Sequence, residues 1–130
     1  MGCYISSRYS EFYITDYDAA LAAIRKLVIR AKRNGRGFAW VDSNSVLKAR
    51  TIEEALKLWG WDFAPERSHD PIEFVGEKMG DDRALFEAIA PFVRDGSYLE
   101  LEGGDGATFR WNFRGGKVIT TEPDVVWPEL

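Results

Sequence analysis

The single histidine, His69, lies in a short run that also holds a serine and an aspartate, Ser68 and Asp70. These three residue types form the catalytic triad of many hydrolases. A triad assembles from distant segments with its nucleophile on a rigid turn, whereas neighbours on a loop point in different directions. The run therefore predicts a solvated loop. One histidine and one cysteine, Cys3, are also too few for a structural zinc site, which needs four ligands, and we expect no metal or other cofactor.

Carboxylates offer a second kind of chemistry. Glu100 and Glu102 are two positions apart in a segment typical of a strand, and Asp105 follows in the next turn. Carboxylates that lie close together can bind a cation or share a proton. Arg110 is expected opposite Glu100, which favours an exposed and partly paired strand face. A carboxylate-dependent enzyme is therefore the least favoured function.

Two glycine-containing segments could bind phosphate. A phosphate cradle needs a strand, then glycines, then a helix N-terminus. Gly103 to Gly106 lies between two expected strands, which favours a turn. Gly76 to Asp82 does run from a strand into a helix and contains Lys78, but Asp81 and Asp82 at the helix start would repel phosphate. Neither segment predicts an anion site.

Aromatic residues are more numerous than the expected core requires, with Trp 5, Tyr 5 and Phe 8. Large rings bury much area in a small domain, and they are also enriched in binding surfaces. Trp61 and Phe63 lie in the segment from Trp61 to Asp70, which we expect to be a loop, and Trp127 lies in the C-terminal tail. The surplus predicts that some rings, including Trp61 and Phe63, belong to a binding patch.

Composition limits the remaining classes of fold and function. A chain of 130 residues with 45% hydrophobic residues is expected to form one domain, residues 1–130, with a core of its own. The net charge of −4 argues against direct binding of nucleic acid, because proteins that bind it usually carry a basic face. No apolar run is long enough for a membrane span, and no signal-peptide pattern is present, so a cytoplasmic protein is expected. Met1-Gly2-Cys3 fits a pattern for N-terminal lipidation. We do not expect lipidation, because a strand-like sequence follows this pattern directly. The oligomeric state is left open.

The elements that must position these residues begin with a strand from Tyr4 to Ile14. A helix capped at Thr15-Asp16 follows, with apolar residues at helical spacing from Ala20 to Ala31 and an end at Asn34-Gly35. We expect a short strand from Gly37 to Val41 and a loop from Asp42 to Lys48. Thr51 and Glu54 predict a capping box, in which each side chain accepts the other residue's amide, and Gly60 follows that helix.

Beyond the loop from Trp61 to Asp70, Ile72 to Val75 reads as a strand. Gly80-Asp81-Asp82 is expected to cap a third helix, which ends near Pro91. Its apolar face comprises Leu85, Phe86, Ile89 and Phe92.

The last third of the chain can be put in register. Its apolar residues alternate with polar ones on two strands, and both apolar sets must share a face. That requirement pairs Leu101 with Phe109 and Leu99 with Trp111, so that Glu100 lies opposite Arg110. Gly106 then takes the left-handed position of a three-residue hairpin. A turn at Gly115-Gly116 sets Phe113 opposite Val118.

These elements predict an α+β fold. We expect one mixed, mainly antiparallel sheet with a C-terminal three-stranded meander. About three helices should pack mostly on one face of the sheet. The outward face of the meander would carry Tyr98, Glu100, Glu102, Arg110 and Asn112.

Four stretches of the sequence form one pattern: Ile89 to Val93, Gly96 to Glu100, Gly104-Asp105-Gly106 and Phe109-Arg110-Trp111. This pattern resembles a family of small uncharacterised proteins of bacteria and phages. Gly76-Glu77-Lys78 and the helical segment from Ala20 to Leu27 share its pattern. The motifs that match are turns and core aromatics, so the resemblance implies no catalytic residues. It implies a gene carried by phages or other mobile elements, whose small proteins often bind and block a host protein.

The function we expect is therefore a non-catalytic protein-binding module. It could inhibit a host defence complex, in the manner of an anti-CRISPR protein, with an acidic strand face that imitates nucleic acid toward a basic partner. The alternative is a small-ligand or nucleotide-binding module that stacks rings against its ligand. The expected binding residues are Tyr98, Glu100, Glu102, Asp105, Arg110, Asn112, Trp61 and Phe63.

Overall fold

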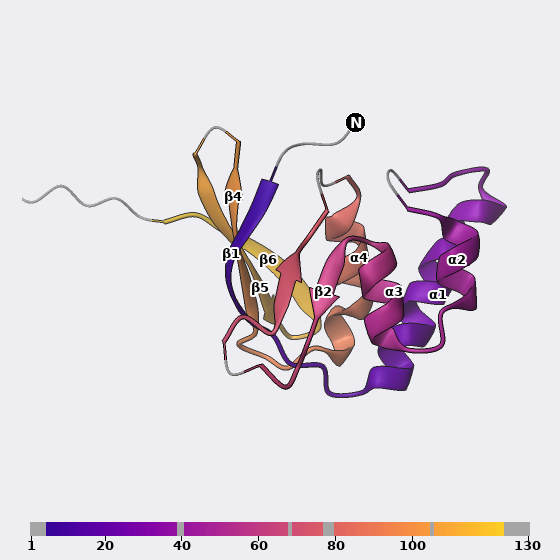
Figure 1. The fold of residues 1–130 in the computed structure, drawn as a ribbon, viewed down its shortest axis with the longest axis horizontal. Helices are drawn as coiled ribbons and strands as arrows, with labels where there is room; N and C mark the ends of the chain where they lie inside the picture. Colours follow the sequence, from indigo (N-terminus) through magenta and orange to yellow (C-terminus); the bar gives the residue numbers. More distant parts are fainter. Residues whose placement is uncertain (1–4, 39–40, 68, 77–79, 105, 124–130) are drawn as a thin grey trace, which may run out of the picture.

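The computed structural model describes residues 5–38, 41–67, 69–76, 80–104 and 106–123. The fold is α+β, as predicted, and the described residues form four α-helices with a four-stranded and a two-stranded antiparallel sheet. The strand order of the larger sheet is β1-β4-β5-β6, and β2 pairs with β3. Its strands are β1 (Ile5–Glu11), β4 (Tyr98–Gly103), β5 (Thr108–Arg114) and β6 (Lys117–Thr121). Figure 1 shows the helices gathered on one side of this sheet.

Helix α1 (Tyr17–Arg33) confirms the predicted helix and its caps. The Asp16 carboxylate accepts the backbone N–H of Ala19 at 3.0 Å, which satisfies a donor that the first turn leaves free. Asn34 is the C-cap, and Gly35 follows with φ 68°. The residues that face the core recur at helical spacing: Ala20, Leu21, Ile24, Val28 and Ala31.

The segment after α1 corrects two expectations. The described residues of the expected strand from Gly37 to Val41 are not in a strand, and its positions 39–40 lie outside the described residues. The expected loop from Asp42 to Lys48 contains helix α2 (Ser43–Lys48). The sequence signal for this helix is its N-cap residue, Asp42. The Asp42 carboxylate accepts hydrogen bonds from the backbone N–H groups of Asn44 and Ser45. Those hydrogen bonds, and one from the Ser45 hydroxyl, lower the pKa of Asp42.

Helix α3 (Ile52–Leu58) shows half of the predicted capping box. Thr51 Oγ1 accepts the Glu54 N–H at 3.2 Å, as expected. The Glu54 carboxylate accepts the backbone N–H of Arg50 and not that of Thr51. Gly60 follows the C-cap with φ 94°, as predicted.

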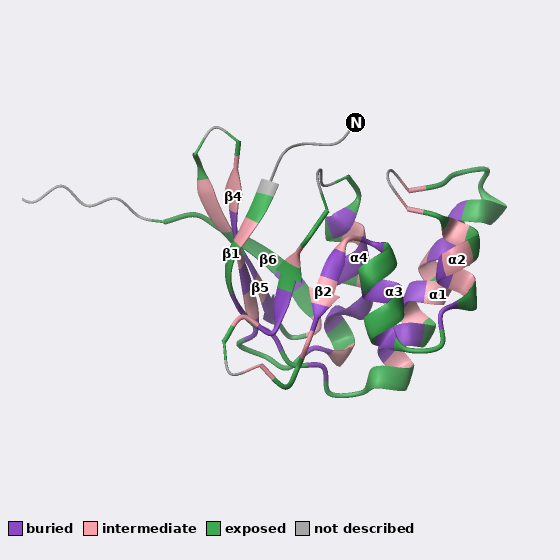
Figure 2. Cartoon of the chain, in the orientation of Figure 1, coloured by how far each residue is buried: buried purple, intermediate pink, exposed green. Residues whose placement is uncertain are grey.

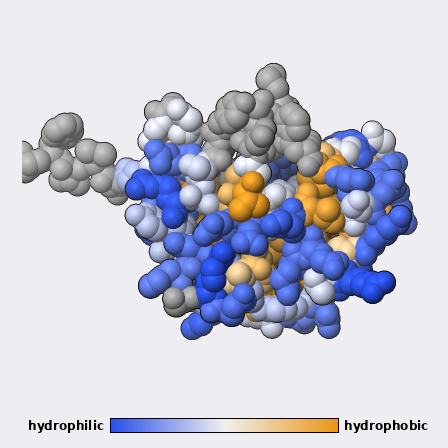
Figure 3. All heavy atoms as spheres, in the orientation of Figure 1, coloured by the Kyte–Doolittle hydropathy of each residue, from blue (hydrophilic) through white to orange (hydrophobic). Residues whose placement is uncertain are grey.

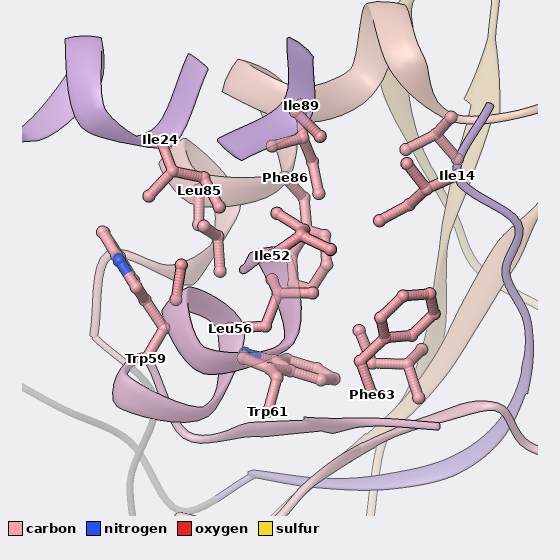
Figure 4. Packing of buried hydrophobic residues seen from close by; sticks show 14 of the residues in the cluster. Ile14, Ile24, Ile52, Leu56, Trp59, Trp61, Phe63, Leu85, Phe86 and Ile89 are labelled. Carbon is pink, nitrogen blue, oxygen red and sulfur yellow. The ribbon is translucent and has the colours of Figure 1, made fainter. Parts of the chain in front are cut away.

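The expected loop from Trp61 to Asp70 begins with a strand. β2 (Trp61–Phe63) pairs with β3 (Ile72–Phe74), which places Trp61 opposite Phe74 and Phe63 opposite Ile72. Trp61 is 0% exposed and Phe63 is 6% exposed, so neither ring belongs to a surface patch. Figure 4 shows both pointing into the core toward Leu56 and Phe86. The prediction that they form part of a binding surface is therefore wrong.

Helix α4 (Asp82–Ile89) starts at the predicted position, and Pro91 lies in the single 3-10 turn Ala90–Phe92 that follows. Asp82 does not cap the helix from outside; it is the first helical residue and is 5% exposed. Its carboxylate accepts the indole N–H of Trp61 at 2.7 Å and the Gly80 N–H at 2.9 Å. This contact fastens α4 to β2.

The C-terminal meander has the predicted register. Leu99 lies opposite Trp111, Leu101 opposite Phe109, Glu100 opposite Arg110 and Phe113 opposite Val118. Gly106 has φ 85°, and its N–H donates to Gly103 O at 2.9 Å, as a three-residue hairpin requires.

The core lies between the larger sheet, β2–β3 and the helices, where Figure 2 shows the buried residues. Phe12 and Phe86 are at its centre, and both are fully buried. Phe12 contacts Phe63, Phe86 and Phe113 edge-on, with ring centroids 5.4 to 5.9 Å apart. Each such pair contributes about 0.5–1.5 kcal/mol beyond area burial. The core therefore fixes the inner side of the sheet and leaves the other side uncovered.

Candidate functional site

The candidate site is the solvent side of the four-stranded sheet, which we call the outward sheet face. Paired residues share a face, so Glu11, Tyr98, Asn112 and Ile119 form one row across the four strands. The next row contains Tyr9, Glu100, Arg110 and Thr121. The face comprises Ser6, Arg8, Tyr9, Glu11, Tyr98, Glu100, Glu102, Thr108, Arg110, Asn112, Arg114, Lys117, Ile119 and Thr121.

A β-bulge in β1 adds one residue, Arg8, to this face. Ser7 pairs with Leu101, but the next paired residue is Tyr9, which lies opposite Glu100. Arg8 is the extra residue, and a bulge re-aims the side chains around it. Tyr9 is on the face through its regular alternation with Glu11, and it is 53% exposed. The bulge allows Arg8 to contact the glutamates of β4 beside it.

Serine side chains hold β1 in place from its other edge. Ser10 is 4% exposed; its hydroxyl donates to Ile72 O at 2.9 Å and accepts the Ile72 N–H at 3.3 Å. The Ser10 N–H donates to the Asp70 carboxylate at 2.9 Å. Ser7 Oγ accepts the Phe74 N–H at 2.9 Å. These bonds replace a regular ladder between β1 and β3 and satisfy polar groups at that edge.

Two of the three acids of the outward sheet face, Glu100 and Glu102, are matched by arginines. Arg110 Nε donates to Glu100 Oε1 at 2.9 Å, and the Glu100 side chain is 13% exposed. Arg8 Nε lies 3.9 Å from Glu100 and 3.7 Å from Glu102. The predicted pair of Glu100 and Arg110 is confirmed. Over the whole face, four cations stand against three acids, so it carries no excess negative charge. This balance does not favour the imitation of nucleic acid.

Tyrosines and arginines form cation–π pairs on the face and at its margin. The guanidinium of Arg110 lies 4.3 Å from the centroid of the Tyr98 ring, and that of Arg8 lies 5.5 Å from that of Tyr9. At the margin, Arg94 lies 5.7 Å from the Tyr13 ring, which is 47% exposed. Such pairs contribute about 0.5–1 kcal/mol each at exposed sites. They hold long side chains in fixed positions at the surface.

Shallow hollows lie on and beside this face. One of them has a volume of about 390 Å³ and is lined by Tyr98, Arg110, Asn112, Arg114 and Ile119, among others. A second, of about 270 Å³, lies on the other side of Arg110 and includes Glu100 and Glu122. A third, of about 290 Å³, joins the margin to the face, because Tyr9, Tyr13 and Tyr98 all line it.

His69 and Asp70 line that third hollow. Asp70 has φ 49°, a left-handed conformation that aspartate tolerates better than most residues. Its carboxylate is engaged by the Ser10 N–H, which is a structural role. Ser68 lies outside the described residues, so the run considered above as a triad cannot be placed. No group of three or more potential metal-ligating side chains occurs within the described ranges.

The structure brings together five of the predicted binding residues: Tyr98, Glu100, Glu102, Arg110 and Asn112. Asp105 lies outside the described residues, and so do Gly2, Cys3, Lys78 and Trp127. Sequence reasoning missed Arg8, Tyr9, Tyr13 and Arg94. Tyr9, Glu11 and Tyr13 do alternate in the sequence, which is a usable signal, but the bulge that brings Arg8 to the face leaves no such pattern.

Asp82 is the buried acid among the described residues, and its pKa is raised. Its removal from water raises the pKa of the carboxyl above 3.8, and the hydrogen bonds from Trp61 and Gly80 oppose that rise. It is covered by core residues on the inner side of the sheet, away from the outward sheet face.

Figure 3 views the helix and β2–β3 side of the molecule, which is largely hydrophilic with small hydrophobic patches. No described helix has the length and hydrophobicity of a membrane span.

Comparison with protein-family models, with curated proteins and with solved structures finds no match for this chain. The resemblance to a family of bacteria and phages accordingly stays a prediction.

Proposed function

We propose that this chain is a non-catalytic protein-binding domain and that its partner docks on the outward sheet face. The observation that carries this proposal is the two Arg–Tyr pairs on the outward sheet face, Arg110 with Tyr98 and Arg8 with Tyr9, and a third pair, Arg94 with Tyr13, at its margin. Tyrosine and arginine are over-represented among the residues that contribute most to protein–protein binding. The strands hold these side chains on a rigid support.

The distribution of cations supports the same face. Protein interfaces are enriched in arginine and depleted in lysine. Among the described residues, three of the four cations of the outward sheet face are arginines, namely Arg8, Arg110 and Arg114. The fourth is Lys117, which pairs with Arg114 at the end of the face next to the turn. The other described lysines lie on helices α1, α2 and α3, at positions 26, 32, 48 and 57.

The contacts of the face also favour binding without catalysis. Glu100 and Glu102 pair with Arg8 and Arg110, so the carboxylates considered as catalytic groups are engaged by cations. Ion pairs and ring stacking fix the side chains before a partner arrives. A surface ordered in advance loses less conformational entropy on binding.

A narrower proposal names the partner as a host protein complex, with this chain as a mobile-element inhibitor of a defence system acting in the cytoplasm. It depends on the resemblance given above. Its test is a plaque assay with cells that carry the defence system. Phage growth restored by the chain would support it, and unchanged restriction at full expression would contradict it.

A nucleotide-binding module is the second candidate, favoured by the stack of Tyr98 and Arg110 beside a hollow of about 390 Å³. That volume is within the range of small-molecule sites, about 300–1,000 Å³. A specific nucleotide would raise the melting temperature by mass action. A thermal-shift screen in which no nucleotide raises it would exclude this candidate.

The main proposal is tested with matched surface variants. Tyr98→Ala removes a ring from the face, and Ile29→Ala removes an exposed apolar side chain, 39% exposed, from α1. Proteins recovered from host lysate are compared for the wild type and both variants, and the affinity of any stoichiometric partner is then measured. We expect Tyr98→Ala to weaken binding by about thirtyfold or more, as loss of a central tyrosine does, while Ile29→Ala binds like the wild type. Equal binding by all three proteins would contradict the proposal.

A further inference from the structure

We propose that the partner presents an aspartate or glutamate side chain whose carboxylate binds the two Nη groups of Arg110. This inference rests on the proposed function, since it names the chemistry that the outward sheet face recognises. It begins with the geometry of Arg110, whose side chain is half-exposed in the middle of the face.

The Arg110 guanidinium is engaged by the protein at its Nε edge and on one of its two planar faces. Its Nε donates to Glu100 at 2.9 Å, and its plane lies over Tyr98 at 4.3 Å. A guanidinium has five donors. Within the described residues, neither Nη of Arg110 has a hydrogen-bond partner. The pair of Nη groups is the part of the fork that binds a carboxylate through two parallel hydrogen bonds.

The surroundings of Arg110 favour an anion on one side. The hollow of about 390 Å³ is lined by Arg110 and Arg114 and by no acidic residue. The hollow on the other side of Arg110 contains Glu100 and Glu122, which would repel a carboxylate. An acidic side chain therefore fits the first hollow, with Arg114 adding a favourable potential at its far end.

Arg8 does not offer an equivalent site. Its Nε lies near both Glu100 and Glu102, and its Nη1 donates to Thr108 Oγ1 at 3.4 Å. Its donors are thus divided among groups of the chain itself. The preference for a carboxylate should consequently depend on Arg110 far more than on Arg8.

The experiment selects peptides from a random display library on the purified full-length protein. The wild type is compared with Arg110→Gln, with Arg110→Lys and with Arg33→Gln, which removes the same charge from the exposed end of α1. We expect peptides selected by the wild type and by Arg33→Gln to carry an acidic residue at a fixed position. Arg110→Lys keeps the charge but not the fork, so it should bind those peptides about tenfold more weakly. Arg110→Gln should select no acidic residue at that position.

Three results would overturn the inference. In the first, peptides bind the face without an acidic preference, which leaves the proposed function standing. In the second, Arg110→Lys binds the acidic peptides as tightly as the wild type. In the third, NMR titration shows that inorganic phosphate shifts the Arg110 Nε–H resonance at lower concentration than acetate does, which would assign the site to a phosphate and not to a protein carboxylate. Failure to select any peptide on the face would count against both the inference and the proposed function.

Discussion

Replacing Trp61 by phenylalanine should destabilise the protein in a pH-dependent way. The change removes the indole N–H that donates to the buried Asp82 carboxylate at 2.7 Å and leaves that carboxylate with the Gly80 N–H. A hydrogen bond to a charged group contributes about 1.5–3 kcal/mol. The smaller ring should cost about 1 kcal/mol more in packing. We therefore expect a loss of about 2.5–4 kcal/mol at neutral pH.

The sign of the pH dependence follows from the raised pKa of Asp82. Burial raises it above 3.8, so the folded state binds the proton more readily than the unfolded state. The carboxylate therefore destabilises the fold above its folded pKa, and that penalty fades as pH falls toward 3.8. Without the indole N–H the pKa rises further. The cost of Trp61→Phe should then be largest at neutral pH and shrink toward the packing loss in acid.

Urea unfolding followed by circular dichroism at several pH values measures this cost. Trp59→Phe is the matched control, because Trp59 is 4% exposed and its indole N–H has no hydrogen-bond partner among the described residues. That control should lose about 1 kcal/mol at every pH, as a packing change does. If Trp61→Phe cost the same free energy at about pH 4.5 as at about pH 7.5, the assigned coupling between Trp61 and Asp82 would be refuted.

Three further predictions concern the backbone and the edges of the sheet. Gly116→Ala should lower stability by about 1–2 kcal/mol in thermal unfolding, because φ is 75° in this tight turn; an unchanged melting temperature would contradict it. Asp70→Ala should cost about 1–2 kcal/mol by leaving the Ser10 N–H without its acceptor, whereas Asp70→Asn, which keeps an acceptor and tolerates φ 49°, should cost less than half of that; equal losses in urea unfolding would refute this role. Arg83→Ala should increase self-association in light scattering, because Arg83 donates to Val118 O at the open edge of β6; a monomer at all concentrations would show that the edge needs no cover.

The parts of the fold that the sequence predicts well are those where several local signals agree. In the meander, alternation, glycine positions and the charge pair of Glu100 with Arg110 all require one register. In α1, the cap at Asp16, the helical spacing and Gly35 agree in the same way. Such agreement between levels is what specifies a single structure.

The missed elements depend on contacts distant in sequence. β2 has only three residues, and its strand conformation comes from pairing with β3 and from burial of Trp61 against Phe86, whose ring centroids are 4.8 Å apart. A short aromatic segment beside a proline has no periodicity that distinguishes it from a loop. Helix α2, at six residues, depends on the Asp42 cap and its packing on α1 and α3.

The candidate site was predicted in its centre and missed at its margin. Tyr98, Glu100 and Arg110 follow from the register of a hairpin, which is local information. Arg8 reaches the face through a bulge, and Arg94 meets Tyr13 through the tertiary fold. Neither arrangement has a pattern that can be found by reading along the chain.

Site-specific photo-crosslinking tests the central claim most directly. Benzoylphenylalanine is placed at position 98 or 9 on the outward sheet face, and at position 29 on α1 as the control. After irradiation in host cells, we predict that both face positions capture the same protein and that position 29 does not. Capture of a protein from position 29 alone, with none from positions 98 and 9, would contradict the claim that the outward sheet face is the binding surface.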